Sequence, residues 1–384
     1  MRSDFANIDV FDRRIFEMKK RCLKRIVLLV LVMFFLCGFS VFADGGSEEN
    51  RVNITVPESL REYLPDDVEN FHATDVMDRF DFGFFTKTGM KILTEAAPEA
   101  VKLFAMLFGV LLLCAVLAVV KRTVTVPGVQ VAMDLVSMVC VASAVFTVTG
   151  GIFSLAEEFI SSISSFMTSV TPTMAGFMIA RGEITSAAVI SGVIFTAVSL
   201  LENIVASVLF PLIRLSLCMS LVTNLFGIPG ISGIAPAVKK LISYVFGFVT
   251  ASLSAVLMFQ RIIAKSTDSL AMRGIKFAVG QFVPFVGGAV NEALSTVLGG
   301  IGTIKAATGV TGAVIVCLIA AVPVIRMLLQ KTFVEWLSVF AGILGLSGEG
   351  KLMSEISSYL GYVSAIMAIS AVFFILSLSM MATV

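Results

Sequence analysis

The stretch LFAMLFGVLLLCAVLAVV, residues 103–120, contains no charged side chain. A helix that crosses the hydrocarbon core of a bilayer needs about 20 apolar residues, so this stretch predicts a membrane-spanning helix. The whole chain has a similar character, because 57% of its 384 residues are hydrophobic and only 14% are charged. Soluble domains carry about 25% charged residues. We therefore predict a polytopic membrane protein.

Further apolar stretches of spanning length follow along the chain. The stretch 184–226 is too long for one span, and we predict that it divides at Glu202 and Asn203 into two helices. The predicted spans after the first are 131–155, 184–201, 204–226, 241–259, 309–325, 333–346 and 359–382. The fold class is thus predicted to be all-α, with about seven or eight spans in a transmembrane domain over residues 101–384.

Two regions do not have the pattern of plain spans. Residues 160–183 contain Pro172 in a run rich in Ser and Thr, and residues 277–305 contain Pro284 and several glycines. Irregular backbone at membrane depth survives only inside protein or beside a water-filled cavity. Transporters place their binding sites at such interrupted helices. We therefore expect both regions to be broken or re-entrant segments.

Polar side chains within the apolar stretches are the candidate functional residues. A charged side chain at the bilayer centre costs roughly 2.5–3.5 kcal/mol on insertion scales, so each one needs an explanation. We expect either a polar path or an Arg–Glu lock between helices, whereas Asp134, Glu202 and Lys305 are expected to snorkel or to lie at the membrane interface. The candidate conduit or helix-lock residues are Arg214, Glu292, Asn291, Pro284, Pro172, Glu202 and Asn203.

The N-terminal 100 residues are expected to lie outside the bundle. Residues 1–43 have the basic, apolar and small-residue parts of a cleavable signal peptide, and a complete signal begins at Met18, which we predict to be the true start. Residues 44–100 carry 13 acidic and 5 basic side chains. We predict that they form a small acidic extracytoplasmic region.

The composition argues against several classes of protein. One His in the chain makes a His-based metal site or catalytic triad improbable, and a net charge of +1 without a basic stripe argues against nucleic-acid binding. The stretch 345–351 resembles a phosphate loop, but Leu352 stands where the Mg²⁺-binding Ser or Thr is needed. We expect no enzyme activity, no metal and no cofactor. The abundant Gly suits close helix packing in lipid, including a homo-oligomer.

The chain resembles the stage III sporulation protein AE family of endospore-forming bacteria. The resemblance covers about three quarters of the chain, from near residue 103 to the C-terminus. Its most distinctive parts are VTPTMAGFMIARGEITSAA (170–188), RGIKFAVGQFVPFVGG (273–288) and residues 309–326. These parts resemble the family in their overall residue pattern and contain no catalytic motif, so no catalytic residues carry over from the family.

The resemblance implies a role in sporulation. Family members work with companion proteins of the stage III sporulation operon A, and together these proteins build a transenvelope channel between mother cell and forespore. The resemblance implies the same surroundings for this chain. The implied partners are the other membrane and ring-forming proteins of that operon, a cytosolic ATPase companion and a forespore-side channel protein. The implied location is the mother-cell-derived outer forespore membrane, and the implied function is needed for late forespore gene expression and forespore integrity.

Two alternatives remain open from the sequence alone. The chain could be a self-contained secondary transporter that binds a small solute at the broken helices 160–183 and 277–305. It could instead be a structural scaffold without a conduit.

Overall fold

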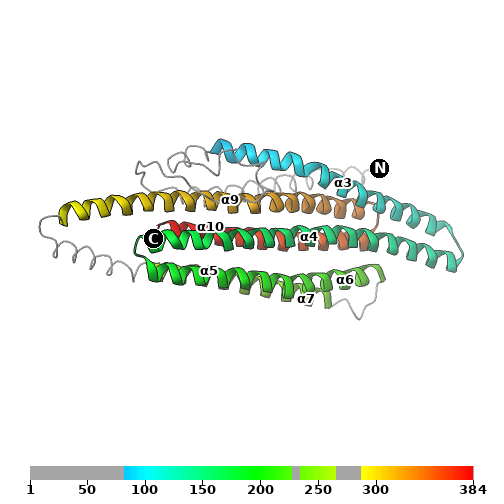
Figure 1. The fold of residues 1–384 in the computed structure, drawn as a ribbon. Helices are drawn as coiled ribbons and strands as arrows, with labels where there is room; N and C mark the ends of the chain where they lie inside the picture. The colour runs from blue at the N-terminus through cyan, green and yellow to red at the C-terminus, as the bar shows by residue number, and fades with distance from the viewer. Residues whose placement is uncertain (1–81, 227–233, 265–286, 384) are drawn as a thin grey trace, which may run out of the picture.

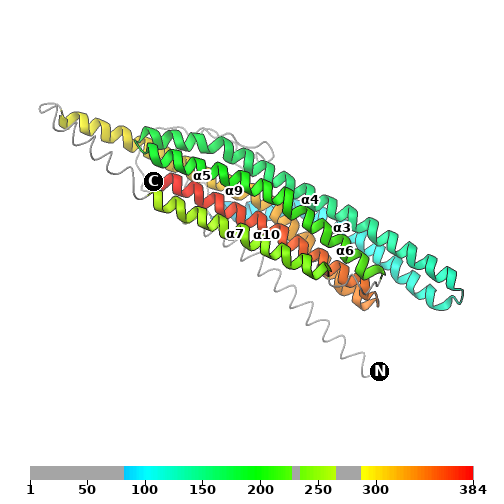
Figure 2. The same ribbon diagram turned by 90° about the horizontal axis from the view of Figure 1, so that it is seen from below.

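The computed structural model describes residues 82–226, 234–264 and 287–383, and all structural statements below concern these residues. They form helices, with no strand among them. Figure 1 shows long helices that lie side by side in one elongated bundle, and Figure 2 shows the same bundle from below. The predicted all-α class is confirmed. The predicted signal peptide (1–43) lies outside the described residues, and residues 82–100 form the first part of a helix.

The helices run up and down the bundle in chain order. They are α3 (Phe82–Thr123), α4 (Pro127–Ala180), α5 (Ile184–Ile204), the π-helix η3 (Val205–Leu209), α6 (Phe210–Phe226), α7 (Ile234–Ala264), α9 (Gly287–Ile343) and α10 (Ser347–Thr383). Six helical runs among them are long and apolar enough to cross a membrane, with α5, η3 and α6 forming one run. The chain is therefore a multi-pass membrane protein.

Several helices are much longer than a bilayer requires. The 54 residues of α4 and the 57 residues of α9 correspond to about 80–85 Å of helix. The hydrocarbon core is only about 30 Å thick. Parts of α4 and α9 therefore extend beyond the hydrocarbon core.

The predicted interruption of 160–183 is wrong where the structure describes it. The helix α4 continues through Pro172 to Ala180, and α9 is continuous from Gly287 onward, which covers most of 277–305. A proline removes one backbone hydrogen bond, but the buried apolar residues of α4 continue at helical spacing on both sides of it. Packing along this face outweighs the local cost. Residues 277–286, including Pro284, lie outside the described residues.

The predicted division at Glu202 and Asn203 is also wrong, because no turn separates two helices there. Only the hydrogen-bonding pattern of the helix changes locally. The helix continues, and its hydrogen bonding widens to a π-helix over Val205–Leu209. The amide of Asn203 donates to the carbonyl oxygen of Ser199 over 2.8 Å, so this polar side chain is satisfied within the helix. Short π segments inside α-helices are rare and occur often at functional sites.

Glycine closes the turn between α4 and α5. Gly182 has φ of +86°, its N–H donates to the carbonyl of Ile179, and the N–H of Glu183 donates to the carbonyl of Met178, each over 2.9 Å. This pattern is the Schellman motif, which needs a left-handed residue directly after the helix. It turns the chain sharply enough that α5 packs back along α4.

The centre of the bundle is the pair α9 and α10. These two helices share the most extensive packing, and α9 also contacts α3 and α4. A Cβ atom at Gly309 would lie 2.5 Å from the Cβ of Ala382, so the two helices meet there without room for a side chain. The absence of a side chain at Gly309 thus allows the close approach.

Hydroxyl groups join α10 to the neighbouring helices. Buried Ser216 of α6 hydrogen-bonds to the hydroxyl of Tyr359, and Ser377 donates to Gln260 of α7 over 3.3 Å. Hydrogen bonds between membrane helices contribute about 0.6 kcal/mol on average. These hydrogen bonds help to fix the relative orientation of helices whose core is otherwise held together by apolar packing.

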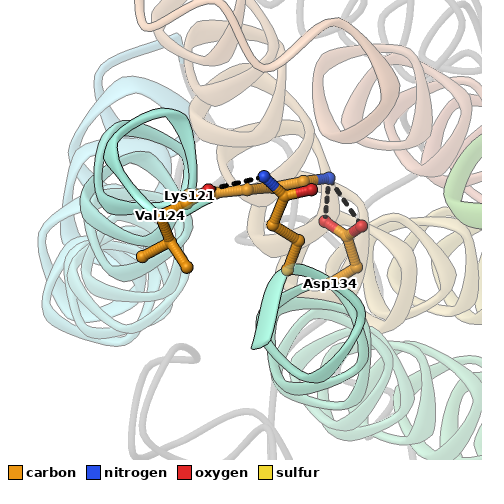
Figure 3. A network of polar contacts seen from close by, with 4 residues as sticks. Lys121, Val124 and Asp134 are labelled. Carbon is orange, nitrogen blue, oxygen red and sulfur yellow. Dashed lines mark hydrogen bonds and ion pairs between the residues drawn. The ribbon is translucent and has the colours of Figure 1, made fainter. Parts of the chain in front are cut away.

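An exposed ion pair closes the corner between α3 and α4. Figure 3 shows the ammonium group of Lys121 between both carboxylate oxygens of Asp134, at distances of 2.7 and 2.6 Å. The amide of Gln130 donates to the carbonyl of Val124 in the connecting turn, over 2.7 Å. Asp134 is thus paired on the outside of the bundle, as the interface interpretation expects.

We predict that Gly309→Ala lowers the free energy of unfolding by about 1–3 kcal/mol, because the added methyl group overpacks the contact between α9 and α10. Denaturation by sodium dodecyl sulfate in mixed micelles measures this. Gly299→Ala in the same helix is the matched control, because a Cβ there meets no atom within 4 Å. Equal stability of the two variants would contradict the close approach at Gly309.

Candidate functional site: a polar face on α4 and α5

The second half of α4 is apolar inside the bundle and polar outside it. Its buried side chains between residues 159 and 178 are large and apolar apart from Thr171. The exposed positions between Glu158 and Ile179 hold only hydroxyl residues, proline and glycine. They are Ser161, Ser165, Thr168, Ser169, Pro172, Thr173 and Gly176. This spacing follows the 3.6-residue period and forms one continuous stripe.

The neighbouring helix α5 carries a similar stripe. Its exposed small or polar positions recur every three or four residues, and they are Thr185, Ala188, Gly192, Thr196, Ser199 and Asn203. Two large apolar residues, Ile184 and Phe195, are exposed beside them. The helices α4 and α5 lie side by side in both views of the bundle. We call the exposed residues of these two stripes the polar face.

Some other exposed surfaces of the bundle carry large apolar side chains. Large apolar side chains are exposed along the hairpin of α3 and α4, for example Val119 at 63% and Val139 at 64%. The outer side of α7 exposes Phe248 and Met258. Such surfaces suit contact with lipid chains. The polar face therefore differs from the surfaces that suit lipid.

The polar face offers hydrogen-bonding groups but no charge along most of its length. Some of its side chains bond back to their own helix: the hydroxyl of Thr196 donates to the carbonyl of Gly192 over 2.8 Å. Each hydroxyl oxygen still has acceptor capacity for water or a partner. Among the described residues no group of three His, Cys, Asp or Glu is placed to hold a metal ion. The chemistry available here is hydration and close contact, rather than a bond-making step.

A charged pair stands where the polar stripe of α4 ends. Arg214 of α6 lies 3.7 Å from Glu157 of α4, measured from Nη2 to Oε1, and both side chains are 58% exposed. The guanidinium carbon lies 4.6 Å from the ring centre of Phe153. The pair holds α4 and α6 together on their outer sides while leaving both charges open to solvent or ligand.

The candidate residues from the sequence are only partly brought together. Pro172 and Asn203 are exposed on the polar face, Arg214 lies beyond its end, and Glu202 is half-buried just before the π-helix. Asn291 and Glu292 belong to the first turns of α9, where only the backbone is described, and Pro284 lies outside the described residues. The lock that the structure shows for Arg214 has Glu157 as its partner.

A buried ion pair ties α9 to the turn between α4 and α5. The side chain of Lys305 is fully buried, and its ammonium nitrogen lies 2.9 Å from Oε2 of Glu183, which is itself 11% exposed. Arg181 approaches the other oxygen of Glu183, with Nε at 3.7 Å from Oε1. An unpaired charge at this depth would be costly, so the pair is required once Lys305 is buried.

Sequence reasoning missed the partners in both ion pairs. Neither Glu157 nor Glu183 is among the candidate residues from the sequence, and 122 positions separate Glu183 from Lys305 in the chain. The stripe on α4 had a visible signal, since Ser161, Ser165 and Thr168 already follow the helical period in the sequence. A helical projection of residues 158–180 would have revealed it.

We predict that Lys305→Met lowers the free energy of unfolding by about 3–5 kcal/mol, because it leaves the carboxylate of Glu183 buried without its partner. The double variant Lys305→Met with Glu183→Gln should recover part of this loss. Denaturation in mixed micelles measures all three chains. The exposed pair of Lys121 and Asp134 is the control: Lys121→Met should lower the free energy of unfolding by no more than about 1 kcal/mol. A double variant that is no better than Lys305→Met would show that the pair is not the cause.

Known proteins similar to this chain come from sporulating bacteria. The family model described as stage III sporulation protein AE matches residues 70–384. A relative with that name from Bacillus subtilis (strain 168) is 29% identical over 258 residues, which cover 66% of this chain and 63% of the relative. The aligned part is thus less than two thirds of that relative. No solved structure matches. Because the family model includes every helix described above, the chain belongs to the stage III sporulation protein AE family.

Proposed function

We propose that the chain is a membrane subunit of a sporulation channel between mother cell and forespore, and that its polar face lines the conduit. The family and the six apolar helical runs establish a multi-pass membrane protein of sporulation, and the channel role goes beyond them. The observation that carries the proposal is the polar face itself. A membrane protein that exposes five hydroxyl groups between Ser161 and Thr173 of one helix needs water or a partner there.

One chain leaves the polar face open on the outside of its bundle. A closed conduit would therefore need several copies or companion proteins around it. The other membrane and ring-forming proteins of operon A are the proposed companions, with a separate ATPase and a forespore-side channel protein. We place the chain in the mother-cell-derived outer forespore membrane, with residues 44–100 on the extracytoplasmic side after removal of the signal peptide 1–43.

The transporter alternative has lost its structural argument over the described residues. It required interrupted helices at 160–183 and 277–305 as binding elements. The helix α4 is continuous to Ala180 and α9 is continuous from Gly287, whereas residues 277–286 lie outside the described residues. A scaffold without a conduit differs from our proposal in one respect: it would not need the polar face to meet water.

We predict that a cysteine at Thr168 or Thr196 reacts rapidly with a water-soluble methanethiosulfonate reagent in sporulating cells after engulfment. The proposed conduit would hydrate both positions, whereas lipid would shield them. The background chain has its six native cysteines replaced by alanine. The readout is the extent of labelling over time, with sporulation efficiency measured in parallel.

The matched control is Phe248→Cys on α7, which is 62% exposed on an apolar surface. We expect this thiol to react slowly because lipid chains cover it. Equal labelling at Phe248 and at the two threonines, or no labelling at the threonines, would contradict a hydrated polar face. It would leave the scaffold as the better account.

A further inference from the structure

A groove between α4 and α6 begins at the charged pair and continues along apolar side chains. Its volume is about 410 Å³. The walls come from one side of each helix, and the lining residues of α4 recur at intervals of one turn between Val145 and Glu157. This stretch of 12 residues is about 18 Å long. The groove is thus a narrow channel with a charged end and an apolar length.

The charged end presents one cation and one anion side by side. Arg214 and Glu157 are 3.7 Å apart and more than half exposed, so both charged groups remain accessible to a ligand. The guanidinium group has five N–H donors, and the carboxylate has about four acceptor positions. The ring of Phe153 under the guanidinium fixes its orientation. A ligand with an anion and an ammonium group would match both partners.

The apolar length has room for a hydrocarbon chain. Val145, Leu217 and Leu221 line it, and a Cβ at Gly150 would meet no atom within 4 Å. Burial of apolar surface contributes about 25 cal/mol per Å². A chain lying there would gain contact with both helices at once.

The charged end closes a long uncharged stretch of α4. Residues 135–156 of α4 contain no charged side chain, and this stretch ends at Glu157 on one side and at Asp134 on the other. The 23 residues from Asp134 to Glu157 correspond to about 34 Å of helix. Asp134 is paired with Lys121 at the far boundary, as Figure 3 shows. Each boundary of this stretch therefore carries an ion pair.

From these observations we propose that the groove is a binding site for a phospholipid with an ethanolamine headgroup. The phosphate contacts Arg214, the ammonium group contacts Glu157, and one acyl chain lies along the apolar wall. An anionic lipid without an amine would bring no cationic group to contact the carboxylate of Glu157. A choline lipid has no N–H to donate to that carboxylate. The site therefore selects ethanolamine lipid over both.

Native mass spectrometry of the full-length chain in detergent tests the proposal. The chain is incubated with phosphatidylethanolamine, phosphatidylglycerol or phosphatidylcholine of identical acyl chains, and with free phosphoethanolamine as a fourth arm. We expect ethanolamine lipid to be retained most strongly, and free phosphoethanolamine not to be retained because it lacks the chain. Equal retention of the three lipids would overturn the proposal.

Two charge variants separate the roles of the pair. Arg214→Gln should reduce retention of ethanolamine lipid about tenfold or more, as expected for loss of a charge-assisted hydrogen bond. Glu157→Gln should abolish the preference for ethanolamine over glycerol lipid, because the carboxylate is what disfavours the anionic lipid. Glu158→Gln is the control, since this exposed carboxylate is adjacent in sequence but does not line the groove. An unchanged preference in Glu157→Gln would refute the assigned headgroup.

A third variant fills the apolar length without touching the charges. Gly150→Leu places a side chain in open space inside the groove, and leucine is also the better helix former. We expect it to reduce retention of every lipid. Gly151→Leu, which also meets no atom within 4 Å but does not line the groove, should leave retention unchanged. Circular dichroism confirms that both variants fold, and equal retention by the two would place the lipid elsewhere.

Discussion

The ammonium group of Lys305 lies fully inside the bundle, 2.9 Å from the carboxylate of Glu183. This contact joins the central helix α9 to the turn between α4 and α5. Both ions lose water on burial, and each needs the other to remain charged there. The chain reversal that positions Glu183 also requires the positive φ of Gly182. The pair thus fixes how far α4 and α5 extend along α9, and with it the position of the polar face.

The bundle presents different surfaces to different surroundings. Large apolar side chains are exposed on the outside of the hairpin of α3 and α4 and on the outside of α7, and these surfaces suit contact with lipid chains. Hydroxyl and small residues predominate on the outside of α4 beyond Glu158 and of α5, with Phe195 also exposed on α5. The pair of Arg214 and Glu157 stands between these regions on the outer side of α4 and α6. The proposed conduit and the proposed lipid site occupy opposite sides of that pair.

Composition and hydropathy were enough to predict the helical membrane class, because the bilayer penalises every alternative backbone. The predicted spans 309–325 and 333–346 were wrong as separate helices, since both belong to the continuous helix α9. The continuity of α4 through Pro172 was not predictable, since it depends on packing against α9 and α10 that outweighs one missing hydrogen bond. The pairing of Lys305 with Glu183 was not predictable either, because residues 122 positions apart meet only through the fold. Arg214 stays a candidate residue, and the structure pairs it with Glu157 rather than with a residue predicted from the sequence.

The central claim is that the polar face of α4 and α5 meets water rather than lipid in the assembled complex. Electron cryomicroscopy of the complex purified into lipid nanodiscs tests it most directly. We predict that Thr168 and Thr196 face an aqueous passage, while Phe248 faces the lipid of the nanodisc. A map in which lipid covers Thr168 and Thr196 would contradict the account.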